Sequence, residues 1–307
     1  MDPYFSANFF SWFWVFLSRL PLLITFQYEE LYSDEIQLIV MALFALSASF
    51  LGVFLLLKRL TMMANALTHT MLLGIVLAFI FSPTQPPPEW IIIVAALSIA
   101  LLTGALIQEL SRVWCISEDA SNAIVFSMLF ALGITLLSLW SKDSHAGPEL
   151  LMGNPDALQV GDIPLVTVVA LLSLTTGLFF MRGLKVAIFD PTFATLSGFM
   201  PALFSHLLLA QVALTTVSAF RAVGFVMTLS FFVIPALIAR RLSHNLSSML
   251  LCSAGVALGA VMVSVALSRH LFSMLFLPVA TGPLAAVLLG IIYIALLILQ
   301  QRKEVPA

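Results

Sequence analysis

Long apolar runs recur along this 307-residue chain and constrain its fold more than any other feature. Several runs approach the length of about 20 residues that an α-helix needs to cross a membrane. Hydrophobic residues make up 61% of the sequence and charged residues only 9%, against about 25% charged in soluble domains. The runs do not alternate with polar residues, which excludes a transmembrane β-barrel. The sequence therefore predicts an all-α, polytopic transmembrane helical bundle.

The apolar runs and the breaks between them predict about nine spans, within a range of about 8–10. We expect residues 1–307 to form a single transmembrane domain. The segment 5–26 either spans the membrane or lies at its surface, because Arg19 and Pro21 interrupt its apolar run. Residues 189–200 are predicted to form a turn and a short helix capped by Asp190. The nine predicted spans are 36–57, 60–81, 90–110, 122–140, 164–181, 201–220, 222–239, 246–267 and 282–299.

Basic residues favour the cytoplasmic ends of membrane helices. If the turn at Lys58 and Arg59 is cytoplasmic and the spans alternate, most lysines and arginines between spans fall on that side. We expect an acidic patch on the outer side to be a solvated loop, and attraction of cations is the alternative role. The patch consists of Glu29, Glu30, Asp34 and Glu35.

A polar stripe interrupts the predicted span 60–81. Met62, Asn65 and His69 are spaced by three and four residues, so at about 100° per residue they share one helix face. Imidazole and thioether groups suit transition metals, and polar groups inside a membrane are usually functional. The stripe therefore predicts contact with a metal, while a histidine hydrogen-bonded to a neighbouring helix is the alternative. His206, expected in the middle of the span 201–220, is a secondary candidate.

The sequence lacks motifs with which the chain could bind a nucleotide or catalyse a reaction by itself. It contains no GxxxxGK[ST] nucleotide-binding loop and no HExxH or GxSxG motif. Its net charge of −2 does not suggest a nucleic-acid partner, and its two cysteines are too far apart to predict a metal cluster. These observations favour a permease subunit that is not an enzyme. The alternatives are an ion-coupled secondary transporter, and a polytopic scaffold or intramembrane enzyme.

A series of segments resembles one known family. The first contains Gly52, the pair Lys58-Arg59, the core 65–69 and the pair Leu73-Gly74. The others are 118–133, 149–154, 189–198, 223–242 and 277–283. Together they cover about residues 35–300, and in this order they resemble the zinc, manganese and iron ABC-importer permeases, the membrane subunits of metal ABC transporters.

The resemblance implies a fold similar to that of the vitamin B12 and siderophore importers. Two permease subunits, identical or not, would surround a central path. A separate cytoplasmic ATP-binding subunit would hydrolyse ATP, and an extracytoplasmic metal-binding protein would deliver the substrate. The chain would be a multi-pass protein of a bacterial inner membrane that binds no cofactor of its own. Its substrate would be a divalent transition-metal cation: Mn, Zn or Fe.

The resemblance also assigns residues. His69, Asn65 and Met62 would contact the metal. The loop 239–248, with Arg240, Arg241 and His244, would dock on the ATPase, and 189–198 is a second candidate for that contact. The family core usually has an aspartate where Asn65 stands. A neutral amide oxygen predicts weaker cation binding, or a non-identical partner permease that carries the acid.

Overall fold

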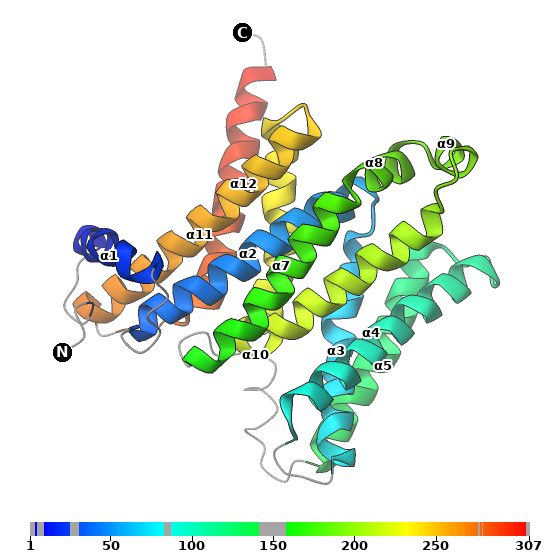
Figure 1. Cartoon of the computed structure of the whole chain (residues 1–307), viewed down its shortest axis with the longest axis horizontal. Helices are drawn as coiled ribbons and strands as arrows, with labels where there is room; N and C mark the ends of the chain where they lie inside the picture. The colour runs from blue at the N-terminus through cyan, green and yellow to red at the C-terminus, as the bar shows by residue number, and fades with distance from the viewer. Residues whose placement is uncertain are drawn as a thin grey trace.

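The computed structural model of this chain describes residue 4 and residues 9–24, 31–82, 87–140, 158–275, 277 and 279–304. The predicted features at Glu29, Glu30 and 149–154 lie outside these residues. Within them the chain forms helices and no strands, which confirms the predicted all-α bundle. The helices are α1 (Phe9–Ile24), α2 (Ser33–Leu57), α3 (Thr61–Phe81), α4 (Glu89–Arg112), α5 (Glu118–Trp140), the 3₁₀ turn η3 (Val160–Asp162), α7 (Ile163–Phe179), α8 (Met181–Phe189), α9 (Pro191–Leu196), α10 (Pro201–Leu242), α11 (Leu246–Leu275) and α12 (Thr281–Glu304) (Figure 1).

Eight helical stretches among the described residues are long and apolar enough to cross a membrane, in agreement with a prediction of about nine. α1 is not among them. Its 16 residues extend about 24 Å at 1.5 Å per residue, less than the hydrocarbon thickness of about 30 Å. α1 instead packs against α11 (Figure 1). Whether the segment 5–26 crosses the membrane or lies at its surface stays a prediction, because residues 5–8 and 25–26 lie outside the described residues.

The short helix predicted within 189–200 is α9. Asp190 caps it, because its Oδ1 atom accepts a hydrogen bond of 2.8 Å from the backbone N–H of Phe193. This cap confirms the predicted role of Asp190 and fixes the direction in which the chain leaves α8.

α10 reverses the chain at Gly224, where φ is 74° and ψ is 170°. Glycine adopts this conformation readily, whereas a side chain would be strained there. Ser205, near the start of α10, accepts a hydrogen bond from Lys58 just beyond the end of α2. The end of α10 leads directly into α11. α11 begins near the same end of α2, because Ser253 of α11 donates a hydrogen bond to the carbonyl of Ser49 in α2 at 3.3 Å.

The two parts of α10 therefore begin and end on one side of the molecule, as antiparallel helices. In Figure 1 the first part runs away from α9, and the second returns toward the start of α11. They correspond to the predicted spans 201–220 and 222–239. The predicted spans place the break at Arg221, but in the structure it lies at Gly224.

α2 is the most buried of the spans and lies at the centre of the bundle. Two glycines let neighbouring helices approach it closely. A Cβ atom on Gly52 would lie 2.0 Å from the carbonyl oxygen of Phe232 in α10. In the same way, a Cβ atom on Gly177 of α7 would lie 2.2 Å from the ring of Phe50 in α2. Close contacts between small residues and backbone are a main source of helix association in membranes.

Gly52→Ala should therefore destabilise the bundle, because its methyl group would collide with backbone that cannot rotate away. Overpacking of this kind typically costs about 1–3 kcal/mol. Gly290→Ala in α12 is the matched control, since a Cβ atom there meets nothing within 4 Å. Thermal unfolding of the detergent-solubilised protein should show a lower midpoint for Gly52→Ala only. Equal midpoints for the two variants would contradict the close crossing of α2 and α10.

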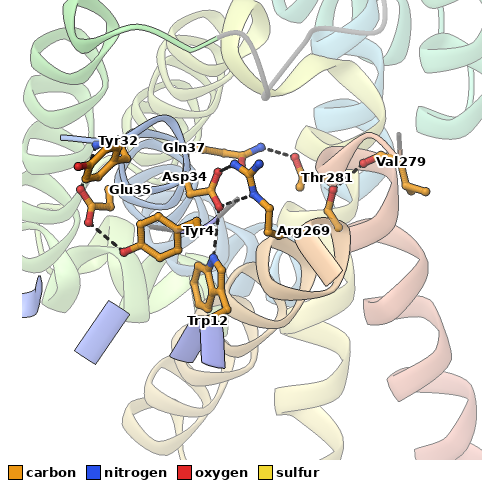
Figure 2. A network of polar contacts seen from close by, with 10 residues as sticks. Tyr4, Trp12, Tyr32, Asp34, Glu35, Gln37, Arg269, Val279 and Thr281 are labelled. Atoms are coloured by element: carbon orange, nitrogen blue, oxygen red, sulfur yellow. Dashed lines mark hydrogen bonds and ion pairs between the residues drawn. The ribbon is translucent and has the colours of Figure 1, made fainter. Parts of the chain in front are cut away.

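The outer ends of α1, α2, α11 and α12 are joined by a polar network (Figure 2). Asp34 and Glu35 are consecutive residues in the first turn of α2, and both are buried. Arg269 of α11 donates through Nε to Asp34 Oδ2 at 2.8 Å. Arg19 of α1 donates through Nε to Glu35 Oε1 at 2.5 Å, and this ion pair raises the pKa of the guanidinium. Each carboxylate thus attaches a different helix to the start of α2.

Aromatic and amide groups complete this network. Trp12 donates to Asp34 at 3.3 Å, and the hydroxyl of Tyr4 donates to Glu35 at 2.9 Å. Gln37 donates to Thr281 at the start of α12 (Figure 2). The expectation that the acids form a solvated loop patch is therefore wrong for Asp34 and Glu35. Their sequence neighbours gave no sign of the arginine partners, one of which is more than 200 residues away.

Asp34→Ala should destabilise the outer end of the bundle, because it leaves the largely buried guanidinium of Arg269 without its carboxylate. Removal of one partner from a buried ion pair costs about 3–5 kcal/mol. Thermal melts of Asp34→Ala, Arg269→Ala and the double variant form a double-mutant cycle. The double variant should be clearly more stable than the sum of the single losses predicts. Strictly additive losses would show that the pair contributes nothing.

Candidate functional site

The predicted stripe of Met62, Asn65 and His69 faces α5. Met62 and Asn65 line a groove of about 410 Å³ between the two helices. The groove is lined from α3 by Met62, Asn65 and Ala66 and from α5 by Asp119, Asn122, Ala123 and Phe126.

α3 and α5 run parallel, and small residues hold them close together. A Cβ atom on Gly133 of α5 would lie 3.1 Å from the backbone nitrogen of Leu73 in α3. On another face of α3, Gly74 packs against the backbone of α4, and Thr103 donates to Thr70 at 2.9 Å. Leu73 lies in an uninterrupted helix. These contacts fix the register that brings the stripe against α5.

His69 lies one helical turn beyond Asn65, against Phe126, which lines the groove. Its ring centroid lies 5.3 Å from that of Phe126 and 5.4 Å from that of Phe130. The two phenylalanine rings are stacked at 5.5 Å with an interplanar angle of 17°. The imidazole is therefore held against an aromatic wall on α5. From this wall the groove extends toward the cytoplasmic side, where Asp119 is exposed.

Two amide oxygens in the groove are buried and unpartnered. The Oδ1 atoms of Asn65 and Asn122 have essentially no solvent contact and, among the described residues, no hydrogen-bond partner. A buried polar atom without a partner costs about 1–3 kcal/mol, and native proteins contain few of them. A ligand that accepts lone pairs, such as a metal cation, would satisfy both oxygens.

Below the groove, toward the cytoplasm, lies a second cavity of about 210 Å³, which shares Asp119 and Asn122 with the first. Three basic residues surround its mouth: Lys58, Arg59 and Arg112. Burial lowers the pKa of the Lys58 ammonium, which donates a hydrogen bond to Ser205. The gathering of these basic residues at one end agrees with the predicted cytoplasmic side.

His206 also lines this second cavity. It is exposed close to the start of α10, and its Nδ1 atom lies 2.6 Å from the carbonyl oxygen of Ala202. The prediction that His206 sits in the middle of a span is therefore wrong, because α10 begins only five residues earlier, at Pro201.

Sequence reasoning missed the α5 half of the groove. Asp119, Asn122 and Phe126 repeat on α5 the spacing of three and four residues found for Met62, Asn65 and His69 on α3. That repeated spacing was the available signal. It was hidden because Asp119 in the first turn of a helix looks like an ordinary favourable charge at a helix start.

The part of the chain that the structure describes contains no group of three or more His, Cys, Asp and Glu side chains able to hold a metal. The donors of the groove are instead of mixed kinds. They comprise one carboxylate, two amide oxygens and one thioether, with one imidazole beside Phe126. Such a set suits a cation that accepts oxygen ligands.

The chain is similar in sequence and fold to known proteins. The family model of the ABC 3 transport family matches residues 34–300. The chain belongs to the ABC 3 transport family. This confirms the resemblance drawn from the sequence motifs.

Relatives of the chain include a probable metal transport system membrane protein from Chlamydia muridarum. It is 37% identical over 97% of this chain and 94% of the relative. The manganese transport system membrane protein MntD from Bacillus subtilis is 32% identical over 72% of this chain and 78% of the relative. Among solved structures, PsaBC from Streptococcus pneumoniae in complex with Fab matches with a TM-score of 0.75 at 23% identity, covering 87% of this chain and 92% of that chain. The last likeness supports the fold alone.

In this ABC 3 transport family member, the predicted docking loop connects α10 to α11. Arg240, Arg241 and His244 are all exposed there, and Gln300 of α12 donates to the carbonyl of Arg241 at 3.4 Å. The second candidate, 189–198, contains α9 and is strongly apolar on its surface. Phe189 is 68% exposed and Phe193 56% exposed. The two segments thus offer different chemistry, one cationic and one aromatic.

Proposed function

We propose that this chain is the membrane-spanning permease subunit of an ABC importer that carries a divalent transition-metal cation inward. The observation that carries the proposal is the groove between α3 and α5, where orphaned oxygen donors lie inside membrane-spanning helices. Polar groups on membrane-spanning helices are costly and usually mark a path for ions. Relatives named for metal and manganese transport support the same substrate class.

In this proposal His69, Asn65 and Met62 contact the cation during its passage, and Mn, Zn and Fe are the candidate substrates. The chain itself does not hydrolyse ATP, and a cytoplasmic ATP-binding subunit supplies that energy. A second permease subunit, identical or not, faces the groove and completes the path. An extracytoplasmic metal-binding protein delivers the cation at the outer surface of a bacterial inner membrane.

Replacement of His69 tests the path. His69→Ala should reduce uptake of radioactive manganese by cells at least about tenfold, the loss typical when a group that supports a metal site is removed. His270→Ala, at the outer end of α11, is the control and should retain uptake. Immunoblots of the membrane fraction must show equal amounts of each variant. Undiminished uptake in the His69→Ala strain would remove this residue from the path.

The ATP-binding subunit docks, in this proposal, on the loop 239–248 and on α9 together. Interfaces commonly combine a central aromatic anchor with a charged rim, and arginine is favoured in both places. Phe193 on α9 would be the anchor. Arg240 and Arg241, with His244 beside them, would steer the partner and make docking sensitive to salt.

Copurification of the ATP-binding subunit with affinity-tagged permease tests this assignment. Phe193→Ala should reduce the recovered partner at low and high salt alike, because an apolar anchor is not screened. Arg240→Ala with Arg241→Ala should reduce it mainly at low salt, because above about 0.15 M salt the charges of the unaltered protein are themselves largely screened. Phe10→Ala, an exposed phenylalanine on α1 at the outer side, is the control. Normal recovery with both the Phe193 and the double arginine variants would place docking elsewhere.

A further inference from the structure

We infer that Asp119 on α5 supplies the acidic ligand that α3 lacks, so that the two helices together form one cation site. The site would take a cation of the Mn²⁺ type. The inference rests on the proposed transport function and specifies where the charge that balances the cation lies. It concerns this chain alone and requires no acid from a partner subunit.

The geometry brings the necessary groups together. Asp119 lines the same groove as Asn65, and Asn122 lies one turn further along α5. Among the described residues, the buried Oδ1 atoms of both asparagines have no hydrogen-bond partner, so a cation that these side chains turn to meet would satisfy both oxygens. Met62 adds a thioether at the same level.

Charge explains why a carboxylate is needed. Two amide oxygens are neutral and would leave a divalent cation uncompensated in a site partly withdrawn from water. Lys58, Arg59 and Arg112 lie in the adjoining cavity and would repel a cation. Asp119 is the acidic residue that lines the groove itself, whereas Glu118 lines only the adjoining cavity. The exposure of Asp119 at the cytoplasmic mouth would let the cation leave by exchanging this ligand for water.

The donor set also narrows the substrate. Carboxylate and amide oxygens suit Mn²⁺, while imidazole and thioether groups favour transition metals over Mg²⁺ and Ca²⁺. A site rich in thiolates, which would favour zinc, is not what the groove offers: Cys115 is exposed outside it, and Cys252 belongs to α11. Mn²⁺ is therefore the probe of choice.

A simpler role for Asp119 must be separated from this one. An acid in the first turn of a helix interacts favourably with the helix dipole whether or not it binds a ligand. Glu118 occupies the same turn and shares that role, but it does not line the groove. Glu118→Gln is therefore a matched control for Asp119→Asn.

The experiment measures Mn²⁺ binding to the complete transporter in lipid nanodiscs, from the loss of the free-ion signal in electron paramagnetic resonance. Asp119→Asn should weaken binding at least about tenfold, and Glu118→Gln should change it less than about twofold. The decisive variant combines Asp119→Asn with Asn65→Asp, which returns one carboxylate to the groove from the other helix. It should restore binding to within about threefold of the unaltered protein.

The inference is overturned if Asp119→Asn binds Mn²⁺ as the unaltered protein does, or if Glu118→Gln weakens binding equally. Failure of Asn65→Asp to rescue a correctly folded Asp119→Asn protein also overturns it. If Asp119→Asn does not fold, Asn122→Leu replaces it, since loss of that amide oxygen should weaken binding severalfold and unchanged binding contradicts the site. The proposed transport function fails separately, if the unaltered transporter neither binds nor accumulates the metal.

Discussion

The register between α3 and α5 determines where the polar groups of the groove lie. Gly133 approaches the backbone of Leu73, so the two parallel helices cannot slide past each other without a collision. A shift of one residue would rotate each stripe by about 100° and separate Asn65 from Asn122. The proposed site therefore depends on a contact between Gly133 and the backbone of Leu73, several turns away from it.

The two ends of the bundle differ in their polar contacts. At the outer end, buried ion pairs and hydrogen bonds join α1, α11 and α12 to the start of α2 (Figure 2). At the inner end, exposed basic residues and an exposed carboxylate surround an open cavity. Between the ends, the rings of Phe126 and Phe130 stand against His69. The groove is therefore reached from the end of the bundle that carries these basic residues.

Much of the fold could be predicted from the sequence, because apolar runs of sufficient length have few alternatives in a membrane. The basic residues at helix ends predict the side of the membrane on which each turn lies. The pairs Asp34–Arg269 and Glu35–Arg19 could not be predicted, because they depend on how distant helices meet. The α3 half of the groove was predicted from its spacing, whereas Asp119 resembled a favourable charge at a helix start. Its position opposite Asn65 follows only from the packing of α3 against α5.

The position of a bound Mn²⁺ ion would test the central claim most directly. Anomalous diffraction at the manganese edge, from crystals of the complete transporter grown with Mn²⁺, locates the ion without reference to any variant. The account predicts a peak in the groove among Asn65, Asn122 and Asp119. A peak elsewhere, such as beside the acids at the outer end of α2, with none between α3 and α5, would contradict it.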